Sequence, residues 1–296
     1  MYTYECVGGD LQSPLFFPEL FQKAPETHSL PLTLSYDYRE HELSPSVIES
    51  YWIDTETFFF RWTHEVACTV CCDNIRVHTE ITTEFQRMIL LKYGVGIALF
   101  LRGFYMLHGS AVRINQKTFV FVGESGAGKS TTAIAFVRAG GELVADDLLV
   151  FEHLGPKNVA ICSFIKQSKL WEDSANEFQF SEKNKLYSNV LKGDKYGFIW
   201  GGRELKNCRV DYIYCLYPPS LGEKPTILTG GDAFVELVKH FPLVKECLAE
   251  SRMLTHFWQT KQLLQHVKLL KFPRPDSYQA LKTWVEHVSR PEVPVY

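Results

Sequence analysis

Short runs of apolar residues, separated by turn residues, fill the first part of the chain. Several runs are rich in aromatic and β-branched residues, which is typical of β-strands. They are Leu32 to Tyr36, Phe58 to Trp62, Ala67 to Cys71 and Ile75 to Thr79. Prolines scattered through the same region interrupt any helical pattern. We therefore expect residues 1–85 to form a β-rich N-terminal domain, with substrate recognition as one role open to it.

The pattern changes to a helical period after these strands. Glu84 to Arg102 has a long apolar face and is preceded by threonines that can cap a helix. Phe104 to Ile114 then reads as a strand, and Asn115-Gln116 as a tight turn into a return strand, Lys117 to Val122. This hairpin is expected to bring His108 close to the segment that follows the return strand.

The last part of the chain is mostly helical by its pattern. Its expected helices are Ala233 to His240, Val244 to Glu250, Met253 to Gln265 and one capped by Asp276, with a short strand at His266 to Lys271. A chain of 296 residues exceeds one typical domain. We predict an α/β protein with three regions: residues 1–85, a core of residues 86–230, and a helical region of residues 231–296 packed on the core.

Composition narrows the classes of function. A net charge of −3 argues against a general affinity for nucleic acid or for an anionic membrane. A hydrophobic content of 46% with 22% charged residues is ordinary for a globular protein with a sizeable core. The longest apolar run, Met88 to Leu101, is interrupted by Lys92, Tyr93 and glycines, and the N-terminus carries no secretion signal. We therefore expect a cytoplasmic protein, and nothing in the pattern predicts a particular oligomer.

A glycine-rich segment after the return strand carries the clearest chemical signal. Gly123 to Ser130 fits the pattern G-x-x-x-x-G-K-S between a strand and a helix. Backbone N–H groups of such a turn converge on phosphate oxygens, and the positive end of the helix dipole favours the same anion. Lys129 can reach the outer phosphates, and the Ser130 hydroxyl can bind magnesium. The predicted ATP- and Mg²⁺-binding residues are Gly123, Glu124, Ser125, Gly126, Ala127, Gly128, Lys129, Ser130 and Thr131.

Two consecutive carboxylates follow at the expected end of the next strand. Asp146 and Asp147 lie between the apolar run that begins at Leu143 and the one that ends at Phe151. Ligands of α/β proteins gather at such strand ends. Adjacent carboxylates repel unless a cation is near, and Mg²⁺ with Lys129 supplies that charge. The alternative is an acidic, solvated turn, since Asp is a common turn residue.

The eight cysteines offer a weaker signal. Cys68 and Cys71 have the spacing of metal ligands, and His64 and His78 are the residues able to complete a zinc site. The same segment alternates like a strand pair, in which cysteine is a small core residue. We favour the core interpretation.

The order and spacing of these motifs carry a resemblance to a known family. The segments His108-Gly-Ser, Gly-Glu-Ser-Gly-Ala-Gly-Lys-Ser and Leu-Val-Ala-Asp146-Asp147 resemble the catalytic domain of bacterial HPr kinase/phosphorylase. The chain is more similar to the HPr-kinase-like serine kinases that modify lasso-peptide precursors. The similarity covers residues 101–152 well and the rest only in outline.

This resemblance implies a fold related to phosphoenolpyruvate carboxykinase, and transfer of the γ-phosphoryl group of magnesium-ATP to a serine hydroxyl of a peptide or small protein. It implies that Asp146 is the catalytic base and that His108 positions it. Asp147 would then be a second acidic residue near the metal, beside Ser130. The chain lacks the family's downstream Glu-x-Arg-Gly signature, which implies a kinase without the reverse reaction. The transition-state cation is left unassigned among Arg203, Lys206 and Arg209.

Two other classes of function stay open from the sequence. One is a kinase for a small metabolite, because no motif encodes the acceptor pocket. The other is a nucleotide-dependent switch or transporter ATPase without a phosphoryl acceptor. A GTPase is disfavoured, because Asn184-Lys-Leu-Tyr187 departs from the N-K-x-D motif at its last position.

Overall fold

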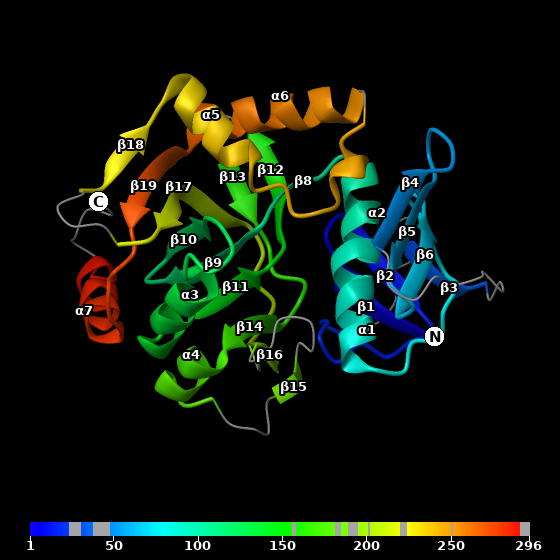
Figure 1. Ribbon diagram of the computed structural model, residues 1–296, viewed down its shortest axis with the longest axis horizontal. Coiled ribbons are helices and arrows are strands. Elements are labelled where there is room, and N and C mark those ends of the chain that lie inside the picture. The colour runs from blue at the N-terminus through cyan, green and yellow to red at the C-terminus, as the bar shows by residue number, and fades with distance from the viewer. Residues whose placement is uncertain are drawn as a thin grey trace. The chain divides into compact units, whose positions relative to one another are not determined.

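The computed structural model describes residues 1–23, 31–37, 48–155, 158–180, 185–188, 195–200, 202–219, 224–249 and 251–290. It is a mixed α/β structure with several sheets (Figure 1). The chain divides into two compact units, Met1–Tyr105 with Leu243–His256, and Met106–Pro242 with Phe257–Tyr296. Each unit is described by itself.

The first unit contains a sheet with the strand order β1-β2-β3-β7-β6-β5-β4. Its strands are β1 (Tyr2–Cys6), β2 (Gly9–Ser13), β3 (Leu32–Tyr36), β4 (Ile48–Trp52), β5 (Phe58–Trp62), β6 (Val66–Val70) and β7 (Asn74–Val77). Strands β3 and β5 have the predicted bounds, and the other two predicted strands are each displaced by one residue at their start. The β-rich character predicted for this part of the chain is thus present in the structure.

A helical segment packs on this sheet. It consists of α1 (Glu84–Ile89), the π-helical stretch η1 (Leu90–Val95) and α2 (Gly96–Leu101). Thr83 caps α1 in a capping box with Gln86. The ring of Tyr93 stacks on Phe60 at a centroid distance of 4.6 Å. These contacts place the segment in the first unit, whereas the sequence pattern predicted a core that begins at residue 86.

The second unit is built on a sheet with the order β11-β9-β10-β17-β13-β12-β8, to which β19 and β18 are added beside β17. Its strands are β8 (Tyr105–Leu107), β9 (Gly109–Ile114), β10 (Lys117–Val122), β11 (Glu142–Asp146), β12 (Leu149–Gly155), β13 (Asn158–Ile161), β17 (Cys208–Tyr217), β18 (Thr226–Leu228) and β19 (Lys268–Pro273). Strands β10, β17 and β19 run parallel to one another. A smaller sheet has the order β14 (Gln167–Trp171), β16 (Lys195–Ile199) and β15 (Lys185–Ser188).

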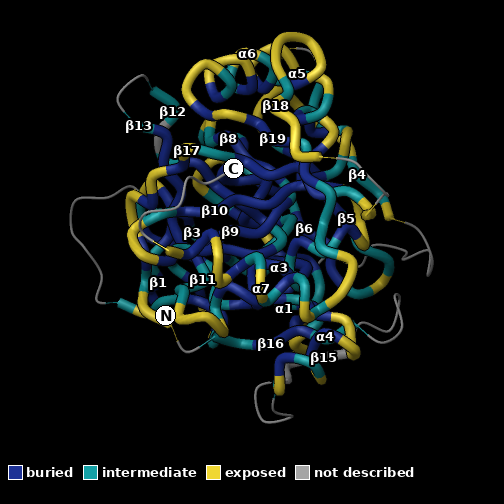
Figure 2. Tube along the Cα trace, turned by 90° about the vertical axis from the view of Figure 1, so that its left-hand side faces the viewer, coloured by how far each residue is buried: buried dark blue, intermediate teal, exposed yellow. Residues whose placement is uncertain are grey.

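The core of the second unit lies between the sheet and helices α3 (Lys129–Arg138) and α7 (Tyr278–Val288). Strands β9 and β10 are buried along almost their whole length (Figure 2). Phe136 of α3 contacts both Phe121 of β10 and Trp284 of α7, with centroid distances of 5.6 and 5.5 Å. This aromatic packing fixes α3, and with it the loop that precedes it, against the sheet.

The remaining helices are α4 (Glu172–Glu177), α5 (Gly230–Val238), the 3₁₀ turn η3 (Lys245–Cys247) and α6 (Ser251–His266). The helix predicted over Val244 to Glu250 is therefore only a short turn, and α7 is capped by Ser277 instead of Asp276. Within the described residues no helix is both long and apolar enough to cross a membrane.

Candidate active site

The glycine-rich loop joins β10 to α3, as the motif predicted. Gly123, Gly126 and Gly128 have φ angles of +144°, +87° and +95°, a region that L side chains rarely adopt. A Cβ atom on Gly123 would lie 2.4 Å from the carbonyl oxygen of Leu216. The loop therefore depends on glycine for its conformation and for its close approach to β17.

Lys129 extends across the loop. Its side chain is buried, and Nζ donates hydrogen bonds to the carbonyl oxygens of Gly123 at 2.8 Å and Glu124 at 3.0 Å. Ser125, Ser130 and Thr131 line the pocket beside the loop. A positive charge thus lies where the backbone turns, which is the arrangement that phosphate groups require.

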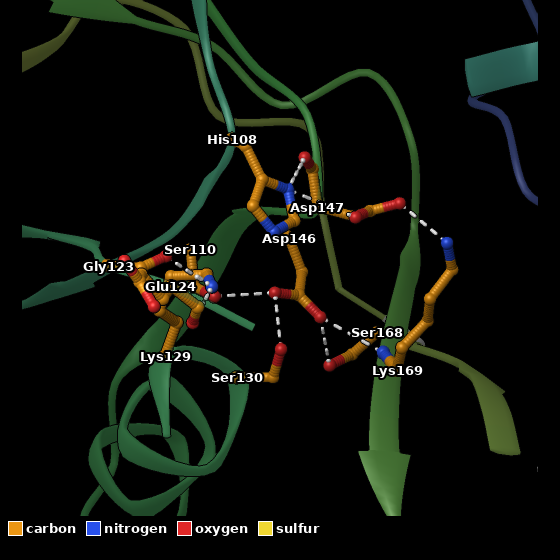
Figure 3. A network of polar contacts seen from close by, with 10 residues as sticks. All are labelled: His108, Ser110, Gly123, Glu124, Lys129, Ser130, Asp146, Asp147, Ser168 and Lys169. Atoms are coloured by element: carbon orange, nitrogen blue, oxygen red, sulfur yellow. Dashed lines mark hydrogen bonds and ion pairs between the residues drawn. The ribbon is translucent and has the colours of Figure 1, made fainter. Parts of the chain in front are cut away.

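Asp146 is held from both of its carboxylate oxygens (Figure 3). Oδ1 accepts hydrogen bonds from the hydroxyls of Ser110 at 2.5 Å and Ser130 at 2.9 Å. Oδ2 accepts hydrogen bonds from the Ser168 hydroxyl at 2.7 Å and from the backbone N–H of Lys169 at 2.9 Å. The side chain is buried, and its link to Ser130 joins the end of β11 to the phosphate loop. Four donors fix this carboxylate in one orientation.

Asp147 has different partners. Its Oδ2 accepts a hydrogen bond from Lys169 Nζ at 2.5 Å, and its Oδ1 lies 3.2 Å from Nδ1 of His108. The same Nδ1 lies 3.0 Å from the Asp147 carbonyl oxygen (Figure 3). The resemblance implied that His108 positions Asp146, but in the structure His108 contacts Asp147.

The strand register explains this difference. Asp146 of β11 is paired with Ser110 of β9, and the backbone N–H of Asp147 donates to the Gly109 carbonyl at 2.8 Å. His108 lies just before β9, at the break between β8 and β9, where one continuous strand had been expected. The antiparallel register therefore places residue 108 beside residue 147. Asp147 has a φ of +73°, which turns its side chain toward His108 and Lys169.

The backbone on the other side of His108 is also fixed. Its N–H donates to the carbonyl oxygen of His240 at 2.6 Å. Burial lowers the pKa of His240 to about 4, so this second imidazole is neutral at physiological pH. His108 is the more exposed of the two histidines and lines the pocket.

One pocket of about 650 Å³ is lined both by the phosphate loop and by His108, Asp146 and Asp147. That volume lies within the usual range for small-molecule sites, about 300–1,000 Å³. The far wall is formed by Trp171 of β14, with Lys195 Nζ 5.6 Å from its ring centroid, and by Tyr278 of α7. Sequence reasoning missed this wall, because the small sheet and α7 have no motif.

Arg274 supplies a cation over the phosphate loop. Its Nη1 donates to the Gly126 carbonyl oxygen at 3.4 Å, and its buried Nε has no hydrogen-bond partner within the described residues. The sequence left three basic residues open as candidates for the transition-state cation. Arg203, Lys206 and Arg209 pair with neighbouring carboxylates, and none of the three lines the pocket. Arg274 follows β19 and Lys169 belongs to β14, so only the tertiary fold brings them to the loop.

The residues in the pocket fit a nucleoside triphosphate and magnesium. Lys129 and the unpartnered Nε of Arg274 suit phosphate oxygens. The Ser130 hydroxyl beside the Asp146 carboxylate provides the oxygen donors that Mg²⁺ prefers, in the pairing that phosphate-loop proteins use. The zinc alternative is not supported, because His78 bonds to Thr69 and to the Asp37 carbonyl oxygen. Cys68, Cys71, His64 and His78 are not brought together as a metal-ligand cluster within the described residues.

Comparison with known proteins adds little to this geometry. No family model matches the sequence, and no curated protein matches it. Among solved structures, the Hpr(Ser) kinase/phosphatase from Coxiella burnetii is similar over 61% of this chain and 86% of that chain, with 13% sequence identity and a TM-score of 0.30. Any function must therefore be inferred from the site.

Proposed function

We propose that this protein is an ATP- and magnesium-dependent kinase that transfers the γ-phosphoryl group to a serine hydroxyl of a peptide or small protein. One observation carries the proposal. A single pocket joins a glycine phosphate loop, a hydroxyl-bound carboxylate and a histidine–carboxylate pair. Phosphoryl transfer needs positioning, neutralisation of charge and one group that orients the nucleophile, and these residues can supply all three.

The phosphate side of the pocket consists of Lys129, Arg274, Ser130 and Asp146. Lys129 and Arg274 both donate hydrogen bonds to carbonyl oxygens of the loop, and they would bind the phosphate groups. Ser130 and Asp146 would hold magnesium, which neutralises charge on the transferred group when it is bound. Both oxygens of Asp146 accept two hydrogen bonds each, so no acceptor site is left for a substrate proton, and this carboxylate would act on magnesium through the Ser130 hydroxyl that it orients. The proposal thus departs from the role that the sequence resemblance implied for Asp146.

The acceptor side consists of His108 and Asp147. Nδ1 of His108 faces only acceptors, the Asp147 carboxylate and carbonyl oxygens, so Nδ1 carries the proton in the neutral imidazole. Nε2 is then an acceptor, and no described residue bonds to it. A serine hydroxyl that enters the pocket would give its proton to Nε2 as its oxygen forms the new bond to the γ-phosphorus. The bond from that phosphorus to the β,γ-bridging oxygen breaks in the same step, and ADP leaves with the bonding electrons. Asp147 orients the ring and stabilises the imidazolium, and Lys169 holds Asp147.

The class of acceptor rests on the sequence resemblance, which suggests a peptide such as a lasso-peptide precursor. The test is incubation of the full chain with magnesium-ATP and a library of serine peptides, followed by mass spectrometry. Phosphoserine is expected with the parent protein and not with Lys129→Met, which removes the cation from the loop. If a free metabolite were phosphorylated and no peptide were, the protein would be a small-molecule kinase instead. ATP hydrolysis without any phosphorylated product would contradict a kinase of either kind.

The two carboxylates can be distinguished by their kinetics. Asp147→Asn should lower kcat by up to about 10⁴-fold, because the carboxylate fixes the tautomer and orientation of the His108 base, with little change in the apparent affinity for magnesium. Asp146→Asn should raise the magnesium concentration needed for half-maximal rate. A loss of kcat confined to Asp146→Asn, with full activity in Asp147→Asn, would show that Asp146 is the general base.

A further inference from the structure

A group of three potential metal ligands lies in the second unit, outside the residues that line the pocket. Cys215 belongs to β17. Glu236 lies on α5, and His240 follows four residues later, just after that helix ends. The Cys215 Sγ is 3.3 Å from Glu236 Oε1 and 4.0 Å from His240 Nε2, and Glu236 Oε1 is 3.5 Å from the same nitrogen. Thiol, imidazole and carboxylate therefore converge on one point.

These separations fit a tetrahedral zinc ion. Zn–S bonds of about 2.3 Å and Zn–N or Zn–O bonds of about 2.0–2.2 Å give ligand-to-ligand distances of roughly 3.3–3.6 Å at tetrahedral angles. The observed distances of 3.3, 3.5 and 4.0 Å lie within a few tenths of an ångström of that range. A small rotation of one side chain would complete the fit, and three protein ligands leave the fourth position to water.

The surroundings suit a metal site as well. The second carboxylate oxygen of Glu236 accepts a hydrogen bond from Lys239 Nζ at 2.8 Å, which fixes the carboxylate from outside the cluster. Cys215 and His240 are buried, whereas the Glu236 side chain is 26% exposed and gives an ion a route from solvent. No residue in the cluster is used by the proposed phosphoryl transfer.

We propose that Cys215, Glu236 and His240 form a zinc site that ties α5 to β17 beside the phosphate loop. Each ligand donates a lone pair, and the Cys215 thiol loses its proton to solvent when the Zn–S bond forms. The site would order two neighbours of the pocket. The His240 carbonyl oxygen accepts the hydrogen bond from the His108 N–H, and the carbonyl oxygen of Leu216, which follows Cys215, leaves no room for a Cβ at Gly123. This proposal does not depend on the kinase activity.

Metal binding to the full chain tests the proposal directly. The protein is loaded with zinc, freed of excess metal by gel filtration, and its metal content is measured. Stoichiometric zinc is expected in the parent and in the control Cys208→Ser, which removes another buried thiol from the same strand. Cys215→Ser should lose the zinc. No retained zinc in the parent, or equal zinc in Cys215→Ser, would overturn the site.

If Cys215→Ser folds poorly, cobalt substitution in the parent protein and the variant Glu236→Gln still test the site. Cobalt in place of zinc should produce a thiolate-to-cobalt charge-transfer band in the parent protein. Glu236→Gln changes a partly exposed residue and preserves its shape, and it should weaken zinc binding by at least ~10-fold in competition with a chromogenic chelator. A cobalt spectrum without the thiolate band, or unchanged affinity in Glu236→Gln, would show that the three residues form only a hydrogen-bonded cluster.

Discussion

Replacement of Asp146 by asparagine should destabilise the protein before any effect on chemistry is considered. The carboxylate accepts four hydrogen bonds, from three serine hydroxyls and one backbone N–H. An amide keeps one acceptor oxygen and turns the other position into a donor. The serine hydroxyls can rotate, but the N–H of Lys169 cannot, so the remaining oxygen must face Lys169 and Ser168.

The expected loss of stability in Asp146→Asn follows from the four hydrogen bonds. Bonds to a charged group contribute about 1.5–3 kcal/mol and neutral ones about 0.5–1.5 kcal/mol, so weakening four of them costs on the order of 3 kcal/mol. For a unit of this size that corresponds to a melting temperature lower by roughly 6–12 °C. The control is Asp211→Asn, a carboxylate that pairs with Arg209 at the surface, which should change stability by less than about 0.5 kcal/mol. Thermal unfolding followed by circular dichroism measures both. Equal stability of Asp146→Asn and parent would refute the buried four-donor site.

Three further predictions concern the loop, the cation and a buried histidine. Gly123→Ala should abolish nucleotide binding measured by calorimetry, because its Cβ would lie 2.4 Å from the Leu216 carbonyl oxygen; binding at parental affinity would contradict the tight loop. Arg274→Ala should raise KM for ATP about tenfold or more, and an unchanged KM would remove it from the phosphate site. Burial lowers the pKa of His256 to about 4, so the unfolded state binds more protons between pH 4 and pH 6.5. Stability should therefore fall as pH falls through this window. His256 should contribute about 2 kcal/mol of the loss at pH 5, beside a similar loss from the buried His240, and His256→Phe but not the exposed His266→Phe should remove the His256 part.

Local signals in the sequence were sufficient for much of the fold. The strands β3 and β5 and the turn at Asn115-Gln116 were predictable, because alternation and turn residues act over a few positions. The phosphate loop was predictable for the same reason, since its glycines are contiguous with the strand and helix that they join. The end of β11 at Asp146 was indicated by an apolar run that stops at a carboxylate.

The parts that could not be predicted depend on contacts between distant segments. Lys169 and Arg274 reach the pocket from the small sheet and from the residue after β19, so no spacing in the sequence signals their proximity. The pairing of His108 with Asp147 depends on the register of β9 and β11 and on the break between β8 and β9. The proposed zinc site has one feature that is local in the sequence, a Glu and a His four residues apart on a predicted helix. Its third ligand belongs to β17, so no spacing in the sequence links it to the other two.

The fate of the γ-phosphoryl group tests the central claim most directly. The full chain is incubated with magnesium and ATP labelled at the γ position, with and without a serine peptide from the library. The label is then measured in phosphoserine and in inorganic phosphate. The proposed site predicts that the label passes to the serine hydroxyl, and that His108→Gln and Asp147→Asn both slow this transfer. Label released only to water, at a rate that the peptide and these substitutions do not change, would contradict it.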